Sequence, residues 1–295
     1  MTAGPDRARA VLDAAAHIAG LAAGGATLIR DGANVMYRLP GQVVARIGRP
    51  GREDTALREV RVSAWLRRNG VAAVEALDDV AQPVVIDGRP VTWWRELPPH
   101  RPAEPAELAT VLRAVHALAP PDGLALPLYE PFAHLDDRIG AAAGLADGDR
   151  AWLRGHLAEL RRRYARLDLP GPPQVIHGDA WQGNVAVPAD GPPVLLDLEA
   201  VALGHRDWDL IQIAVDHADF ARLDAADYRA FVDAYGGYDV VGAPWFRTLA
   251  DIQELRWTTF ALSKAAVSAD ASAQARHRIA CLRGDVPRPW TWAAI

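Results

Sequence analysis

The sequence is poor in the residues that cross-link secreted proteins or anchor membrane proteins. Cys281 is the only cysteine, so no disulfide can form within the chain, as is usual in reducing compartments. No apolar run reaches the ~18 residues of a membrane-spanning helix, and the first residues mix acidic and basic side chains without a signal-peptide core. We therefore expect a cytoplasmic protein with no membrane partner.

Lysine is scarce as well. Lys264 is the only lysine, so arginine supplies almost all of the positive charge. Acidic residues (37) outnumber basic ones (32), and the formal net charge is −5. Because nucleic-acid-binding proteins usually carry a basic surface, this balance argues against nucleic acid as the main partner. A monomer and a homodimer both stay open.

The sequence has enough apolar residues for two parts, each with its own core. Half of the 295 residues are hydrophobic, and roughly 150 residues per domain predicts about two domains. An amphipathic helix is predicted over residues 6–22, and another from Asp54 to Asn69. Alternating patterns and turn residues predict five strands in this part, at residues 26–30, 35–39, 42–47, 84–86 and 91–94.

The remainder of the sequence is mainly helical. Residues 97–103 are rich in proline and predict a hinge or linker. Beyond it, helical patterns occur at about 104–118, 131–143, 147–167, 206–220, 225–236 and 244–266, with one hairpin at 184–198. We therefore predict an α+β protein with a β-rich N-lobe (1–96), a hinge (97–103) and a mainly helical C-lobe (104–295).

One segment carries polar residues in a pattern that suits phosphoryl transfer. His177-Gly178-Asp179 follows a short apolar strand, and Asn184 opens the hairpin. If the hairpin is symmetric about Asp190-Gly191, Asn184 faces Asp197, and hard oxygen ligands so placed suit Mg²⁺. Phosphoryl transfer needs one carboxylate to orient and deprotonate a hydroxyl, and further oxygens to hold metal. Asp179 is the candidate base, and Asn184 and Asp197 are the candidate metal ligands.

These motifs resemble those of the aminoglycoside phosphotransferase family, small-molecule kinases related to the protein kinases. HGDAWQGN (177–184) is similar to the family's catalytic loop, and LLDLE (195–199) to its metal-binding motif. GANVMYRL (32–39) resembles the nucleotide loop, REVRVSAWL (58–66) the helix of the first lobe, and VTWWREL (91–97) the hinge strand. The resemblance covers nearly the whole chain and implies a two-lobed, protein-kinase-like fold.

The resemblance also implies roles for residues. Asp179 is then the catalytic base, Asn184 and Asp197 bind Mg²⁺, and ATP or GTP is the phosphoryl donor. His177 lies in the catalytic loop, and we expect it to pack and to form hydrogen bonds there more than to take part directly in the reaction. Asp209, in GHRDWDL (204–210), resembles an aspartate that supports this loop from the start of a helix. Other residues expected at the nucleotide are Gly32, Asn34 and Glu96.

The sequence departs from protein kinases where a lysine is expected. Protein kinases have a lysine on the third strand that binds the α- and β-phosphates. Here the matching strand, at 43–47, carries Arg46, which keeps the charge and can grip phosphate with two nitrogens. Glu59, in the following helix, is its predicted partner. Glu199 takes the place of the protein-kinase DFG glycine, and both a metal role and a structural role stay open for it.

The acceptor is less well defined by the sequence. An aminoglycoside or other antibiotic, a sugar or an amino alcohol is consistent with it, so antibiotic resistance does not follow. Two other functions stay open: an inactive nucleotide-binding module of the same fold, and a protein kinase. The complete set of catalytic residues argues against the first, and HGD in place of HRD argues against the second. Residues of the C-terminal helices that are candidates for acceptor binding are Asp216, Asp251, Glu254 and Trp257.

Overall fold

The computed structural model describes residues 5–32, 34–293 and 295, and these form two units. The first unit contains the described residues up to Glu104, together with Ala117–Leu126 and Gln182–Val201. The second contains Pro105–His116, Pro127–Trp181 and the chain from Ala202 onward. Within the described residues, no helix combines the length and the hydrophobicity needed to cross a bilayer.

The first unit is built on a five-stranded antiparallel sheet with the strand order β1-β2-β3-β5-β4. The strands predicted from alternation are all present, and the helix α2 (Glu53–Arg68) follows the third of them, as expected. The strands are β1 (Thr27–Asp31), β2 (Val35–Leu39), β3 (Val43–Ile47), β4 (Val84–Ile86) and β5 (Arg89–Arg95).

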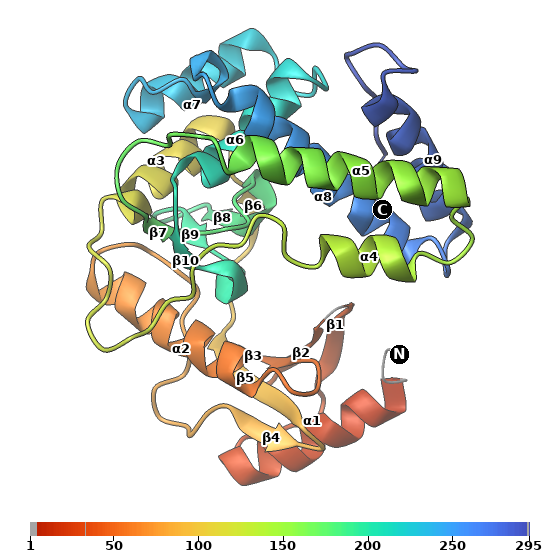
Figure 1. Ribbon diagram of the computed structural model, residues 1–295. Coiled ribbons are helices and arrows are strands. Elements are labelled where there is room, and N and C mark those ends of the chain that lie inside the picture. The colour runs from red at the N-terminus through yellow and green to blue at the C-terminus, as the bar shows by residue number, and fades with distance from the viewer. Residues whose placement is uncertain (1–4, 33, 294) are drawn as a thin grey trace. The chain divides into compact units, whose positions relative to one another are not determined.

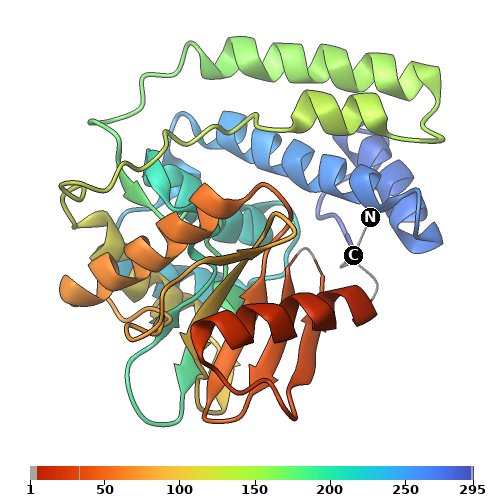
Figure 2. The ribbon, with the colours of Figure 1, turned by 90° about the horizontal axis from the view of Figure 1, so that it is seen from below.

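One face of this sheet packs against the N-terminal helix α1 (Pro5–Ala19). Ala45 pairs with Tyr37 on β2 and with Trp93 on β5, so the three side chains lie on the same face. They are buried in one core with Leu12 of α1. Figure 2 shows α1 lying across this face of the sheet.

The opposite face carries the first candidate residue. Because side chains alternate along a strand, Arg46 must point away from α1, and so do its neighbours Met36 on β2 and Thr92 on β5. Trp94 on this face packs against Val60 of α2. The period-two pattern of β3 therefore places an arginine on the α2 side of the sheet, among apolar side chains.

A later part of the chain extends the first unit. β8 (Val185–Pro188) pairs with β9 (Val194–Leu195) and with β6 (His100–Pro102), which lies within the expected hinge. Leu195 also bonds to the segment after α2, since Val74 N donates to its carbonyl at 3.0 Å. Arg95 N of β5 donates to Glu75 O at 2.8 Å, so this segment joins β9 to the five-stranded sheet.

The register of the hairpin differs by one residue from the symmetric prediction. Val185 pairs with Leu195, and Leu196 N donates to Asn184 O at 2.8 Å, so Asn184 faces Leu196 and not Asp197. Proline has no N–H for a β-ladder, and prolines 188, 192 and 193 make the connection asymmetric. Asn184 closes a single 3₁₀ turn, η1 (Gln182–Asn184), and Asp197 precedes another, η2 (Leu198–Ala200).

The second unit is mainly helical, and Figure 1 shows α4, α5 and α8 running side by side. Six of its helices were predicted, whereas α9 was not, because its buried positions include two small alanines, Ala271 and Ala275, and give a weak apolar pattern. A short turn, η3 (Val240–Gly242), precedes α8. The helices are α3 (Pro105–His116), α4 (Leu135–Ala141), α5 (Asp147–Tyr164), α6 (Asp207–Ala218), α7 (Ala225–Tyr235), α8 (Phe246–Lys264) and α9 (Ala269–Arg283).

A two-stranded sheet in the second unit leads directly into the 177–184 loop. β7 (Gln174–Ile176) pairs antiparallel with β10 (Ala202–Gly204). A Cβ on Gly204 would lie 2.7 Å from Cδ1 of Ile176 and 2.9 Å from Cβ of Tyr129, so only glycine fits at this position. The predicted α+β organisation, with a β-rich N-terminal part and a helical C-terminal part, is confirmed.

Candidate active site

The α2 face of the first unit's sheet borders a cavity of about 430 Å³. Its apolar lining includes Met36, Val44 and Trp94. Its polar lining contains six of the seven residues predicted for nucleotide or metal: Asn34, Arg46, Glu59, Glu96, Asn184 and Asp197. The seventh, Gly32, does not belong to the described lining, and Ala33 of the same segment lies outside the described residues.

Arg46 lies at the centre of the polar residues that line the cavity. Its side chain is 14% exposed, and Nη1 donates to Oε1 of Glu59 in α2. Nη2 lies 3.3 Å from Oδ1 of Asp197 and 3.3 Å from Oε2 of Glu199. With the Asn34 carboxamide oriented to accept, its oxygen lies 2.6 Å from Nη2. A single guanidinium thus contacts three carboxylates and one amide.

The carboxylates around Arg46 carry more negative charge than it can compensate. Burial raises the pKa of Glu59, and Arg46 offsets only part of this rise because Glu199 and Asp197 add to it. Burial alone would lower the pKa of Arg46, yet the three acidic side chains together raise it. Oxygen atoms of Glu59, Asp197 and Glu199 all lie within 4.8 Å of one another. A divalent cation bound here would reduce the repulsion between them.

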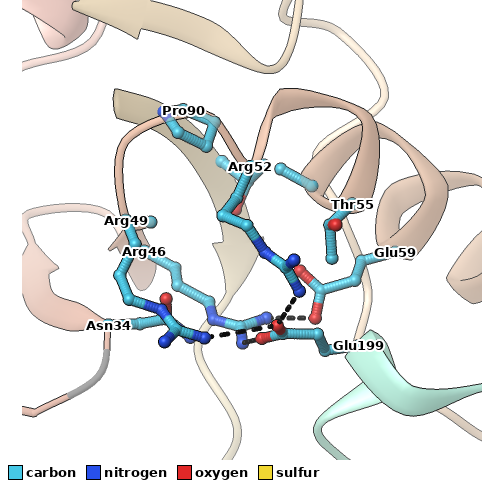
Figure 3. A pocket seen from close by; sticks show the side chains of 11 residues that line it. Asn34, Arg46, Arg49, Arg52, Thr55, Glu59, Pro90 and Glu199 are labelled. Atoms are coloured by element: carbon cyan, nitrogen blue, oxygen red, sulfur yellow. Dashed lines mark hydrogen bonds and ion pairs between the residues drawn. The ribbon is translucent and has the colours of Figure 1, made fainter. Parts of the chain in front are cut away.

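Besides Arg46, two arginines that the sequence did not indicate, Arg49 and Arg52, hold Glu199. Figure 3 shows Arg46, Arg49 and Arg52 converging on its carboxylate. Arg52 Nη2 lies 2.9 Å from Glu199 Oε1, and Arg49 Nη2 lies 3.9 Å from the same oxygen. Burial opposes the charge of Glu199, but the hydrogen bond from Arg52 and the charges of the arginines lower its pKa. These partners are 147 or more residues apart in sequence, so no local spacing signals them.

The backbone of Asp197 is strained. It has φ 49° and ψ 64°, in the left-handed region that residues other than glycine seldom adopt. Such a conformation costs about 1–3 kcal/mol and persists where the surroundings enforce it, often at functional sites. Its carboxylate is about half exposed and turned toward Arg46. The strain therefore coincides with the residue that the sequence assigns to metal binding.

In the second unit, Asp209 organises the 177–184 loop from the first turn of α6. Its Oδ2 accepts from His177 N at 2.6 Å, and its Oδ1 accepts from Gly178 N at 2.7 Å. His177 is fully buried, and its Nδ1 accepts from Asp179 N at 3.3 Å, whereas the side chain of Asp179 is exposed. The expected support of the loop by Asp209 is confirmed, and His177 braces the backbone of Asp179.

A histidine distant in sequence completes this arrangement. His116, at the end of α3, donates from Nε2 to Asp209 Oδ2 at 2.9 Å, and its Nδ1 lies 2.7 Å from the hydroxyl of Tyr235. Burial alone would raise the pKa of Asp209, but the hydrogen bond and charge of His116 and the bond from His177 N lower it. The role of His116 could not be predicted, because it lies 93 residues before Asp209.

The four candidates for acceptor binding do not form one group. Asp216 is paired with Arg222 at 2.9 Å, and Trp257 packs against Phe220 in the helical core. Arg247 binds both remaining carboxylates, at 2.7 Å for Asp251 and 2.8 Å for Glu254. Each carboxylate therefore has an arginine partner within the second unit, and acceptor binding by these residues stays a prediction.

Replacing Asp209 tests the support of the loop through its response to acid. The folded-state pKa of Asp209 lies below its ordinary value of 3.8, so its contribution to stability is complete above that pH and is lost as the pH falls through the folded-state pKa. Asp209→Asn should lower the free energy of unfolding by about 1–3 kcal/mol at neutral pH, because the three hydrogen bonds that its buried carboxylate accepts are weakened or lost. Melting temperatures measured from about pH 7 down to about pH 2 should then fall less steeply in the variant than in the wild type. Parallel curves would contradict this role, and Asp136→Asn, at an exposed position, is the control.

Solved structures resemble the whole chain. A choline/ethanolamine kinase family protein from Mesorhizobium loti matches with a TM-score of 0.64 and 24% identity, over 95% of this chain and 93% of that one. An amicoumacin kinase in complex with AMP-PNP and Ca²⁺ matches with a TM-score of 0.75 and 14% identity, over 96% of both chains. The GDP complex of an aminoglycoside 2′-phosphotransferase variant matches with a TM-score of 0.62 and 13% identity, over 90% of this chain and 93% of that one. At these identities the likenesses establish the protein-kinase-like fold, which the sequence predicted.

Sequence comparison gives the family directly. No curated protein sequence matches the chain significantly. The profile of the Phosphotransferase enzyme family matches residues 26–256, which include the Arg46 cavity, the 177–184 loop and Asp209. The chain belongs to the Phosphotransferase enzyme family, as its motifs indicated, and is a small-molecule phosphotransferase.

Proposed function

We propose that this protein transfers the γ-phosphoryl group of ATP or GTP to a hydroxyl group of a small molecule, with Asp179 as the general base. One observation carries the proposal: six residues predicted for nucleotide and metal binding line a single cavity around the Arg46–Glu59 pair. The division into an N-lobe (1–96), a hinge (97–103) and a C-lobe (104–295), and a cytoplasmic location, are part of the proposal.

The cavity has the two kinds of lining that a nucleoside triphosphate needs. The apolar residues Met36, Val44 and Trp94 suit a planar base. The polar residues include Arg46, whose fork can hold a carboxylate on one side and a phosphate on the other. Glu59 fixes the guanidinium in place, as the glutamate of a protein kinase fixes the lysine. Arg38 and Glu96 form an ion pair in the lining of the cavity, where we expect them to influence the preference between ATP and GTP.

Asn184 and Asp197 would hold Mg²⁺. Both line the cavity and both offer hard oxygen atoms, and carboxylate oxygens of Glu59, Asp197 and Glu199 lie within 4.8 Å of one another, close enough to share a cation. Few protein ligands are needed, because Mg²⁺ is usually completed by phosphate oxygens and water. When bound, the ion would neutralise the charge of the phosphates during transfer.

Asp179 supplies the proton acceptor. The loop backbone is fixed by Asp209 and His177, while Asp179 itself is exposed at the surface of the second unit. A carboxylate fixed in this way can orient the hydroxyl and accept its proton as the bond to phosphorus forms. An inactive module would need none of this support, and family membership favours a small molecule over a protein as the acceptor.

Asp179→Asn should fold normally and lose phosphoryl transfer by ~10²–10⁴-fold, the usual effect of removing a general base. Triphosphate consumption is first screened across hydroxyl-bearing antibiotics, sugars and amino alcohols, and the accepted compound is used to compare the variants. Asp190→Asn, at an exposed turn, is the matched control and should keep wild-type turnover. A folded Asp179→Asn enzyme with near-normal turnover would remove the base assignment.

Arg46 and Glu59 should behave as one unit. Arg46→Ala should raise the Michaelis constant for the nucleotide and lower turnover, because both the grip on phosphate and its orientation are lost. Arg46→Lys should keep part of the activity, since a point charge cannot hold two partners in a fork. Glu59→Gln should act in the same direction. In a double-variant cycle the combined effect should be smaller than the sum, whereas simple addition would show that the pair is not coupled in function.

Asp197 should couple the metal to the nucleotide. In the wild type, removing Mg²⁺ with a chelator should weaken triphosphate binding, as measured by calorimetry, because the phosphates then meet the carboxylates of the site unshielded. Asp197→Ala should make triphosphate affinity nearly independent of Mg²⁺. If the variant keeps the wild-type dependence on Mg²⁺, Asp197 is not a ligand.

A further inference from the structure

Arg49 and Arg52 bind a carboxylate that Arg46 already holds. Nη2 of Arg52 lies 2.9 Å from Oε1 of Glu199, and Nη2 of Arg49 lies 3.9 Å from the same oxygen. Nη2 of Arg46 lies 3.3 Å from the other oxygen, Oε2. Among the residues that the structure describes, neither Arg49 nor Arg52 forms an ion pair with any other carboxylate. Ion pairs of exposed arginines contribute little to stability, so stability alone does not explain three guanidinium groups around one carboxylate.

The connection between β3 and α2 presents both arginines from a fixed backbone. Gly48 N donates to Pro90 O at 2.8 Å, and Gly51 N donates to Gly88 O at 2.9 Å. A Cβ on Gly48 would lie 2.9 Å from Cγ of Pro90, so glycine permits this close approach. Gly51 has φ 72°, which glycine adopts more readily than other residues. Because the backbone is held at both glycines, the two guanidinium groups reach the same carboxylate, as Figure 3 shows.

The two arginines lie beyond Arg46 in the direction of β3. Val44 and Arg46 point to the same face of the sheet and are about 7 Å apart along the strand. Gly48 continues the ladder between β3 and β5, and Arg49 follows it. The order along this side of the sheet is therefore the apolar Val44, then Arg46, then the connection that carries Arg49 and Arg52.

A small cavity beside these arginines adjoins the larger one. It measures about 20 Å³, and Arg49, Arg52 and Glu199 contribute to its lining. Arg46 and Glu59 line both this cavity and the cavity of about 430 Å³. The small cavity has room for little more than one water molecule. A larger oxyanion can therefore reach Arg49 and Arg52 only where the Glu199 carboxylate now lies.

We propose that Arg49 and Arg52 bind the terminal phosphate of the nucleoside triphosphate, in the place that the Glu199 carboxylate takes in the structure. The inference rests on the proposed function, because it concerns the donor of that reaction. A base against Val44 and a phosphate chain that passes Arg46 bring the terminal phosphate to the β3–α2 connection. A phosphate group offers more oxygen atoms and more negative charge than a carboxylate, so it competes well for guanidinium groups. The two arginines therefore distinguish a triphosphate from a diphosphate.

The first test compares the affinities for a triphosphate and a diphosphate without any reaction. Calorimetry with Mg²⁺ measures AMP-PNP against ADP, and GMP-PNP against GDP, and the pair that binds more tightly is used. Combining Arg49→Gln and Arg52→Gln should weaken triphosphate binding at least ~10-fold, because two charge-assisted hydrogen bonds are lost, and diphosphate binding by less than ~3-fold. Arg7→Gln, which removes an exposed arginine of α1 that is paired with Asp87 at 3.9 Å, is the control and should change neither affinity.

Arg49→Gln alone keeps this test independent of how the double variant folds. It removes only the 3.9 Å contact, from a side chain that is 59% exposed, so it should fold normally. Its loss of affinity should be smaller and again confined to the triphosphate. Equal losses for triphosphate and diphosphate, or no loss for either, would overturn the proposal and leave the arginines with the role of holding Glu199.

The second test asks whether Glu199 competes for the same position. With a chelator in place of Mg²⁺, Glu199→Gln should raise triphosphate affinity by ~5-fold or more, because the amide keeps the size of the side chain without its charge. Diphosphate affinity should rise less. Asp13→Asn, which removes a carboxylate from an exposed ion pair of α1, changes the net charge equally and should leave both affinities unchanged. An unchanged or lower triphosphate affinity in Glu199→Gln would contradict the competition and overturn the proposal.

Turnover by the wild type separates this inference from the proposed function. Triphosphate consumption is followed with the same antibiotics, sugars and amino alcohols as for Asp179→Asn. Selective loss of triphosphate binding in the double variant, with no turnover of any compound by the wild type, would support the arginine site and contradict the proposed function. Turnover by the wild type, with equal losses for triphosphate and diphosphate in the variant, would support the proposed function and overturn the arginine site. A wild type that binds no triphosphate would contradict both.

Discussion

The ion pair between Arg46 and Glu59 determines how the first unit's cavity is arranged. β3 must direct Arg46 away from α1, and α2 must present Glu59 to meet it, so the pair fixes the relation of helix to sheet. The same guanidinium also contacts Asp197 and Glu199. These two residues follow β9, which is held in place by hydrogen bonds to the segment after α2. Bringing three carboxylates within 4.8 Å of one another costs free energy, which the nearby arginines offset. This cost is consistent with a site that is completed by nucleotide and metal.

In the second unit the arrangement of charge is the reverse of that around Arg46. There a buried anion, Asp209, collects hydrogen bonds from the backbone of His177 and Gly178 and from His116. Because every partner is a donor, the carboxylate stays charged in a fully buried place and holds the loop in one conformation. A loop fixed in this way presents Asp179 without needing the side chain itself to be buried. The rigidity of the base thus comes from β7 and α6, and not from the loop sequence.

The sequence predicted what depends on local patterns. The match of residues 43–47 to the third strand of protein kinases identified Arg46, the spacing within residues 177–184 gave the order of the candidate residues there, and the helical periods located every described helix except α9. The sequence did not predict what depends on pairing between distant elements. Arg52 meets Glu199 across 147 residues, and His116 meets Asp209 across 93, and neither pair has a local signature. The predicted hairpin register was wrong by one residue for a local reason, since prolines at the end of β8 and in the connection to β9 make the turn asymmetric.

The ion pairs of the second unit show why acidic residues on its helices are a weak guide to the acceptor. Asp251 and Glu254 were candidates in the sequence because acidic residues suit a polycationic acceptor, yet in the structure both bind Arg247. Asp216 is paired in the same way with Arg222. An acidic side chain that already has an arginine partner is accounted for by the structure and has no need of a ligand. The acidic character of these helices therefore does not by itself indicate a polycationic acceptor.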